Sequence, residues 1–209
     1  MNSLMALCNY KQMCHLKNSQ PDLILVSADN AQRFYTHFQN RRKNYEFITL
    51  CRNPYDRFVS GWAFCKNHNW IDHDLDYLTS IDNPDSLKEY RKKYKIGFHH
   101  IFRPQAESLL FKGKLAVDRV IRFEHLQKDY SDLLCDFNYP DKKLLHRNKS
   151  KHKPWQEYYD KNPKLKSFVK RTFANDFKAI KLIASIECTE SNRLSIKAPG
   201  LQPRCFPQN

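Results

Sequence analysis

Arginine and serine side chains flank a predicted helix start in the stretch CRNPYDRFVSGW, which runs from Cys51 to Trp62. Arg52 follows a run of strand-forming residues, and Pro54 suits the first turn of a helix because its missing N–H loses no hydrogen bond there. The guanidinium of Arg52 can donate two hydrogen bonds to one phosphate, and the Ser60 hydroxyl can add another. This spacing predicts an anion clamp at a strand-to-helix turn. The alternative is that Arg57 pairs with a neighbouring carboxylate and Arg52 is a solvated charge.

The basic segment HRNKSKHK at 146–153 carries further groups that bind phosphate. Cationic side chains and a hydroxyl on one loop can close over the phosphates of a nucleotide and stabilise their charge. The alternative is a run of charge that only faces solvent. The candidate ligands in this segment are Arg147, Lys149, Ser150, Lys151 and Lys153.

Strands and helices alternate along the sequence that must position these groups. Short runs rich in β-branched or aromatic residues predict strands, and the segments between them predict helices. This alternation predicts a parallel sheet, in which ligands bind at the carboxyl ends of the strands beside helix N-termini. The predicted strands are 22–27, 44–51 and 115–123, and the predicted helices include 29–43 and 124–137.

The remaining segments set the expected domain boundaries. The stretch 67–95 is polar and rich in turn residues, which predicts a surface excursion with one basic helix. Pro154 is expected to begin a long helix that runs to about Ile183. The last residues show no helical period. We therefore expect one α/β domain over residues 1–186 and an irregular C-terminal tail over 187–209.

Composition bounds the class of protein and of partner. The 209 residues hold 36 Lys and Arg against 22 Asp and Glu, and the net charge of +14 predicts an anionic partner. Hydrophobic residues make up 41%, which is enough for a packed core and excludes wholesale disorder. The seven cysteines form no Cys-x-x-Cys pair, so we expect no disulfide scaffold and no metal site. No run approaches the ~20 apolar residues of a membrane-spanning helix, so no transmembrane segment is expected.

The string RNPYDRFVSGW at 52–62 resembles the 3′-phosphate motif of sulfotransferase family 2, the carbohydrate sulfotransferase-like group. Later segments are similar to the family in the same order: HHIFRPQ at 99–105, VIRFEHLQKDY at 120–130, and HRNKSKH with WQEYYD within 146–160. The resemblance spans about residues 2–180. It implies a P-loop-NTPase-like parallel sheet flanked by helices. It also implies transfer of a sulfuryl group from 3′-phosphoadenosine 5′-phosphosulfate (PAPS) to a carbohydrate hydroxyl, with no metal.

The resemblance assigns roles to single residues and exposes one departure. In the family's motif the first arginine and the serine hold the 3′-phosphate, which implies this role for Arg52 and Ser60. Family members begin with a strand and a Lys-x-Gly-x-Thr-Ser loop that holds the 5′-phosphosulfate, and the helix after that loop resembles the segment from Ser3 to Cys8. Ser3, together with Asn2, is the candidate remnant of the loop. We therefore expect an N-terminally incomplete fold and an impaired activity.

In-line transfer also needs a base for the acceptor hydroxyl, which typically contributes ~10²–10⁴-fold to the rate. His99 and His100 are the candidates, because an imidazole titrates near neutrality. The alternative for each is a helix-capping or core histidine. Further candidates for the base are Asp72, His73, Asp74 and Glu124.

Two classes of function follow from the sequence. The first is a PAPS-dependent sulfotransferase with a carbohydrate or other hydroxyl acceptor. The second is a noncatalytic module that binds a polyanion, either a sulfated glycan or nucleic acid. Nucleic acid is not the expected partner, because no recognised DNA- or RNA-binding motif accompanies the charge. A nucleotide kinase is excluded by the lack of a GxxxxGKS or GxxxxGKT loop. The expected location is the cytoplasm, or the Golgi lumen if an N-terminal anchor has been lost.

Overall fold

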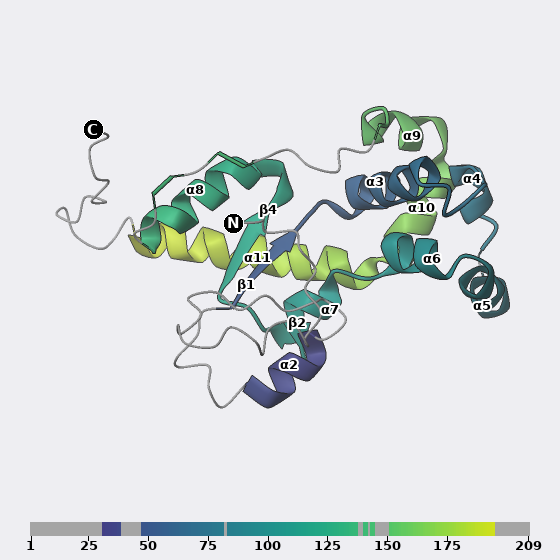
Figure 1. The fold of residues 1–209 in the computed structure, drawn as a ribbon. Helices are drawn as coiled ribbons and strands as arrows, with labels where there is room; N and C mark the ends of the chain where they lie inside the picture. The colour runs from purple at the N-terminus through teal and green to yellow at the C-terminus, as the bar shows by residue number, and fades with distance from the viewer. Residues whose placement is uncertain are drawn as a thin grey trace, which may run out of the picture. The chain divides into compact units, whose positions relative to one another are not determined.

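The computed structural model describes residues 31–38, 47–81, 83–137, 140–141, 143–144 and 151–194. The chain divides into two compact units. The first unit contains residues up to Leu50, the segment Glu107–Leu145 and the chain from Ala179 onwards. The second contains Cys51–Ala106 and His146–Lys178. Figure 1 labels most of the helices and strands of both units.

A two-stranded parallel sheet lies in the described part of the first unit, except for the last residue of one strand, Cys51, which belongs to the second. It pairs β1 (Ile48–Cys51) with β4 (Arg119–Arg122). The pairing is extended at its start, where the Asp118 N–H donates to the Phe47 carbonyl at 2.8 Å and the Phe47 N–H donates to Asp118 Oδ2 at 2.9 Å. The strands are distant in sequence and parallel, as the predicted alternation of strand and helix requires.

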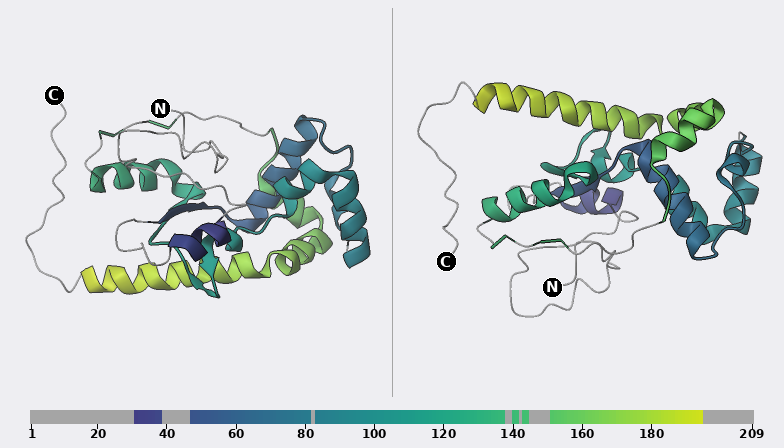
Figure 2. Two further views of the ribbon diagram at one scale, coloured as in Figure 1. Left: turned by 60° about the horizontal axis from the view of Figure 1, so that its bottom comes forward. Right: turned by 90° about the horizontal axis from the view of Figure 1, so that it is seen from above.

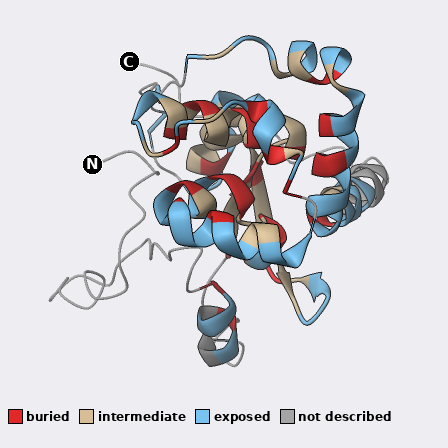
Figure 3. Cartoon of the chain, turned by 90° about the vertical axis from the view of Figure 1, so that its right-hand side faces the viewer, coloured by how far each residue is buried: buried red, intermediate tan, exposed pale blue. Residues whose placement is uncertain are grey.

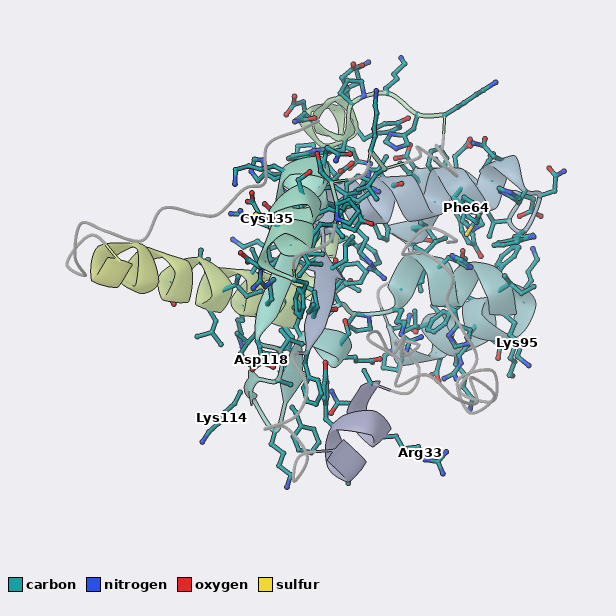
Figure 4. All side chains as sticks on the ribbon, turned by 60° about the vertical axis from the view of Figure 1, so that its left-hand side comes forward. Arg33, Phe64, Lys95, Lys114, Asp118 and Cys135 are labelled. Carbon is teal, nitrogen blue, oxygen red and sulfur yellow. The ribbon has the colours of Figure 1, made fainter. Side chains whose placement is uncertain are left out.

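A short hairpin joins two further strands of the first unit, β2 (Leu110–Phe111) and β3 (Lys114–Leu115). Its two-residue turn has positive φ at both positions, 51° at Lys112 and 76° at Gly113. This geometry is typical of a type I′ turn, whose twist matches that of the strands it joins, and glycine is strained least there. Lys114 extends away from the hairpin into solvent (Figure 4).

Helix α2 (Ala31–Phe38) lies beside this hairpin (Figure 2). The Gln32 amide donates to the carbonyl of Leu110 at 2.6 Å, and the Tyr35 hydroxyl donates to the carbonyl of Ser108 at 2.5 Å. Side-chain donors thus satisfy backbone acceptors around the hairpin, as buried or partly buried carbonyls require.

An ion pair fixes the helix that follows β4. The chain passes through a 3₁₀ turn, η3 (Phe123–His125), into α8 (Leu126–Asp136). Asp129 in the first turn of α8 accepts three hydrogen bonds from Arg122 at 2.9–3.1 Å, one from its backbone and two from its guanidinium. A bidentate pair of this kind adds geometric specificity to the strand-to-helix step.

The second unit is built from helices around one aromatic core. Buried positions of the helices are red in Figure 3. Phe58 lies at the centre, fully buried, with the rings of Phe102, Phe168 and Phe173 at 5.9–6.1 Å. The helices of this unit are α3 (Pro54–Asn67), α4 (Leu75–Leu78), α5 (Pro84–Lys93), α6 (Lys95–Phe102), α9 (Trp155–Lys161) and α10 (Pro163–Thr172). Two helices cross the division between the units, α7 (Ala106–Leu109) and α11 (Ala174–Leu194).

Helices α3 and α6 pack closely because a glycine stands at their contact. A Cβ atom added to Gly61 would lie 2.9 Å from the carbonyl oxygen of His100, closer than real Cβ contacts come. The absence of a side chain therefore sets the distance between the two helices.

The structure corrects several expectations drawn from the sequence. The prediction of one long helix from Pro154 is wrong, because the segment forms three helices, α9, α10 and α11, separated at Asn162 and Phe173. Helix α11 continues to Leu194, so the first part of the predicted irregular tail over 187–209 is helical. The segment 67–95 is more than a surface excursion, since it contributes buried core residues.

The fold class is confirmed only in its coarser form, a mostly helical protein with a small parallel sheet packed against helices. The predicted third strand is shorter than expected, with β4 limited to four residues. The predicted strand at 22–27 and Ser3 lie outside the described residues. Among the described residues, no helix is both long and apolar enough to span a bilayer.

Candidate functional site

The predicted strand-to-helix turn around Arg52 is confirmed. Strand β1 ends at Cys51, and Asn53 caps α3 by accepting a hydrogen bond from the Tyr55 N–H at 3.0 Å. Pro54 occupies the first helical position, where its missing N–H and fixed φ cost nothing. The backbone is thus fixed on both sides of Arg52.

The Arg52 side chain is held within the protein rather than free in solvent. Its Nε–H donates to Asp56 Oδ2 at 2.7 Å, and the two side chains are only 18% and 16% exposed. The alternative of a solvated charge at position 52 is therefore wrong. Arg57, the other arginine of the segment, donates to the Arg103 carbonyl and lies 5.7 Å over the Phe173 ring.

Ser60 lies on α3 one turn beyond Asp56 and is partly buried. Residues four apart in a helix share a face, so Asp56 and Ser60 follow Arg52 along one side of the helix start. The carboxylate between them holds the guanidinium in place, and it also repels an anion at the same position. An anion that binds there must share or replace the ion pair.

Gln105 is a site residue to which the sequence assigned no role. Its side-chain amide donates from Nε2 to the Arg52 carbonyl at 2.8 Å and accepts at Oε1 from the Arg52 N–H at 2.8 Å. This pair of hydrogen bonds fixes the backbone of Arg52, from which the guanidinium side chain extends. Gln105 is the last residue of the segment HHIFRPQ. The sequence pointed to this segment only because it follows the Arg52 segment in the same order as the similar segments of the family.

Asp176 is the second residue that sequence reasoning missed. Its carboxylate is fully buried and accepts from the Gln105 N–H at 3.0 Å and the Ala106 N–H at 2.9 Å. Burial raises the pKa of Asp176, while the two N–H donors and the charge of Arg57 oppose that rise. Asp176 thus supports Gln105, which in turn supports Arg52. The only local sequence signal for this role is that an acidic residue lies between two aromatic residues at the start of α11.

His100, a predicted base, lies on α6 where this helix contacts α3 at Gly61. The centroid of its ring lies 5.5 Å from the ring centroid of Phe64, which Figure 4 labels, and 5.1 Å from that of Trp70. His100 is exposed overall, as His99 is, but the partial burial of its ring lowers the pKa of His100, and the neighbouring charges of His99 and Arg57 lower it further. A neutral imidazole at neutral pH is the form that can accept a proton.

His99 lies beside His100 on α6, with its side chain exposed and its ring 5.9 Å from Phe98. The helix-capping alternative does not fit either histidine, because both belong to the last turn of α6 rather than to its caps.

The other candidate bases lie in or near α4, or in η3. His73 Nε2 is 2.9 Å from the Tyr90 hydroxyl, and burial lowers the pKa of His73. The hydroxyl of Tyr94 holds the pKa of Asp72 below its usual value, and a hydrogen bond from Lys66 does the same for Asp74. Glu124 is exposed in η3 of the first unit.

Of the predicted basic-loop ligands, Lys151 and Lys153 are described and exposed. The predicted ligands Arg147, Lys149 and Ser150 lie outside the described residues, as Ser3 does. The following helix α9 packs on the start of α3. The Tyr159 hydroxyl donates to the Tyr55 carbonyl at 2.9 Å, and the Trp155 and Tyr55 rings stack at 5.8 Å.

Potential metal ligands are scattered over the described part of the chain. No group of three or more metal-ligating side chains comes together there. Burial raises the pKa of the Cys65 thiol to about 12, so this sulfur is a core residue rather than a nucleophile.

Comparison of the chain with protein-family models, curated proteins and solved structures finds no match.

Proposed function

We propose that the protein is a PAPS-dependent sulfotransferase with a P-loop-NTPase-like fold, in which Arg52 and Ser60 bind the 3′-phosphate of the donor. The observation that carries this proposal is the pair of hydrogen bonds between Gln105 and the Arg52 backbone. It joins two segments that resemble the family at separate places in the sequence. The proposed acceptor is a carbohydrate hydroxyl.

Two further contacts support the same proposal, each within one unit. The segment with VIRFEH contains β4, which pairs with β1 directly before the Arg52 turn. The segment WQEYYD contains Tyr159, which donates to the Tyr55 carbonyl on α3. Within the second unit, the segments HHIFRPQ and WQEYYD therefore both contact the turn and helix start that carry Arg52.

The residues of the chain fit an anionic nucleotide in charge and in hydrogen bonding. Arg52 supplies donors and a positive charge at the start of α3, where the helix dipole favours an anion, although Asp56 must share or give up its ion pair with Arg52 when the anion binds. Ser60, one turn beyond Asp56, adds a hydroxyl donor. When bound, PAPS would supply the sulfuryl group to the acceptor oxygen, and adenosine 3′,5′-bisphosphate would leave as the S–O bond to its 5′-phosphate breaks. Arg52 and Ser60 would hold the donor by its 3′-phosphate, and Lys151 would contribute positive charge near the phosphates.

His100 is the proposed base. Its neutral ring would take the proton from the acceptor hydroxyl as the oxygen attacks. The partial burial and the neighbouring cationic groups that lower the pKa of His100 favour this accepting form. His99 on the same helix is the alternative base. The two can be told apart by single substitution to glutamine, since only loss of the base lowers kcat strongly.

The direct test of the binding step is the effect of adenosine 3′,5′-bisphosphate on thermal unfolding. At a concentration 100 times its Kd, a ligand stabilises the folded state by about 2.7 kcal/mol. Arg52→Ala removes a charge-assisted interaction of roughly 1.5–3 kcal/mol, which corresponds to a loss of affinity of about 10- to 150-fold.

Arg33→Ala is the matched control, because Arg33 is an exposed arginine on α2 and its loss changes the net charge equally. We expect its bisphosphate affinity to stay within about twofold of the wild type. An unchanged melting temperature in the wild type, or an equal loss in both variants, would contradict the proposal. Binding that is indifferent to the bisphosphate but falls steeply with salt would favour the polyanion-binding module instead.

A further inference from the structure

A small hollow of about 350 Å³ opens on the surface of the second unit, at the side of α10. Helix α10 packs here against α4, and the residue that follows α4 lines the opposite wall. The volume is at the small end of the range for ligand sites, which suits one ring with a substituent better than a whole nucleotide. The lining residues are Thr79, Pro163, Lys164, Ser167, Phe168 and Arg171.

The charge of this hollow is uniformly positive. Lys164, Ser167 and Arg171 lie three and four positions apart, so they share one face of α10. The sequence of α10, PKLKSFVKRT, contains no acidic residue. The acidic group beside the hollow is Asp76, whose carboxylate accepts from the Asn162 amide at 2.7 Å and is not part of the lining. Two cations and a hydroxyl therefore face the space without a lining carboxylate to neutralise them.

The other lining groups can contact parts of a ligand that an inorganic ion lacks. The Thr79 hydroxyl donates to the Asp76 carbonyl at 2.7 Å, so towards a ligand it offers lone pairs, which accept from a ligand hydroxyl. The exposed Pro163 forms an apolar patch, together with the small part of Phe168 that remains accessible at the hollow. A sugar ring matches both, because it carries hydroxyls at its edge and C–H groups on its face.

We propose that this hollow binds a single sugar unit carrying a sulfate or phosphate ester. Lys164 and Arg171 would hold the oxyanion, Thr79 would accept from a ring hydroxyl, and Pro163 would contact the ring face. The ester could be a sulfate or a phosphate, since the same cations bind either group. This site uses none of the residues assigned to PAPS and does not depend on the proposed transferase activity.

The test uses the full chain and four probes in isothermal titration at low ionic strength: glucose 6-sulfate, glucose 6-phosphate, glucose and inorganic sulfate. We expect one ester to bind at least tenfold more tightly than glucose and than inorganic sulfate. The ester that binds more tightly identifies the natural substituent. Lys164→Ala combined with Arg171→Ala should weaken ester binding at least tenfold, and both residues are exposed, so the fold should be unaffected.

Lys166→Ala combined with Lys170→Ala is the matched control, because both residues are exposed on α10 but do not line the hollow. We expect ester binding within about twofold of the wild type for this pair. Equal losses in the two double variants would overturn the proposal and indicate diffuse attraction to a basic helix. Binding of inorganic sulfate as tight as that of the esters, or no ester binding at all, would also overturn it. Arg52→Ala should leave ester binding unchanged while it weakens bisphosphate binding about 10- to 150-fold, which separates the two sites.

Discussion

At the scale of single residues, the least ordinary group is the fully buried carboxylate of Asp176. Both of its oxygens accept from backbone N–H groups, which favours the ionised form, yet burial is the larger effect and raises the pKa of Asp176. A carboxyl whose pKa is higher in the folded state than in the unfolded state binds a proton more readily when folded. Its contribution to stability is therefore present at low pH and is lost as the pH rises through the folded pKa.

We predict that the wild type loses stability relative to Asp176→Asn as the pH rises from about 3.9, the usual pKa of aspartate, to the raised value in the folded state. The difference between the two proteins changes by at most about 1.4 kcal/mol per pH unit, because one proton is involved. Urea unfolding of both proteins from pH 4 to pH 7 measures it. A wild type that gains stability over the variant with rising pH would mean that the hydrogen bonds outweigh burial.

At the scale of elements, the contact between α3 and α6 decides where His100 lies relative to the helix that carries Ser60. Gly61→Ala improves helix propensity by about 1 kcal/mol, so without a clash it would stabilise the protein. The added Cβ would lie 2.9 Å from a backbone carbonyl, which cannot rotate away. We expect a net loss of about 1–3 kcal/mol in urea unfolding. A stabilised variant would show that the helices can separate without penalty.

Gly113→Ala gives a comparison at a glycine with open space around it. No atom lies within 4 Å of the added Cβ, but φ is +76°. Its cost is therefore backbone strain of about 1–2 kcal/mol, without any displacement of α6. Only Gly61→Ala should also alter the near-ultraviolet signal of the aromatic cluster around His100.

The elements that could be predicted from sequence are those with local signals that agree. The turn before α3 combines a β-branched run, an asparagine cap and a proline at the first helical position, and it forms as expected. The same capping chemistry stands at Asn162 and Pro163, where Asn162 accepts from the Leu165 N–H at 3.0 Å. The sequence analysis missed this helix boundary because the helical spacing of apolar residues continues across it. The break at Phe173 has no such mark and comes from packing in the core.

The candidate site was predictable only in part, for a physical reason. Arg52 and Ser60 belong to one local segment, so their types and spacing could be interpreted directly. Gln105 is 53 positions from Arg52, and Asp176 is 71 positions from Gln105. Contacts over such distances depend on how helices pack, which neither period nor propensity determines. Buried polar groups must nevertheless find partners, and these two residues find each other.

At the scale of the whole molecule, the net charge of +14 acts on every anionic ligand before contact. Long-range attraction speeds encounter, and salt screens it within about 10 Å at 0.1 M, whereas contacts at short range are screened less. We predict that higher ionic strength slows association of adenosine 3′,5′-bisphosphate, while its dissociation rate stays within about twofold. Stopped-flow measurements over a salt series separate the two rates. Arg33→Ala combined with Lys114→Ala, two exposed cations of the first unit, should slow association slightly and leave dissociation unchanged. A salt effect confined to dissociation would mean that local contacts, rather than the field of the protein, attract the ligand.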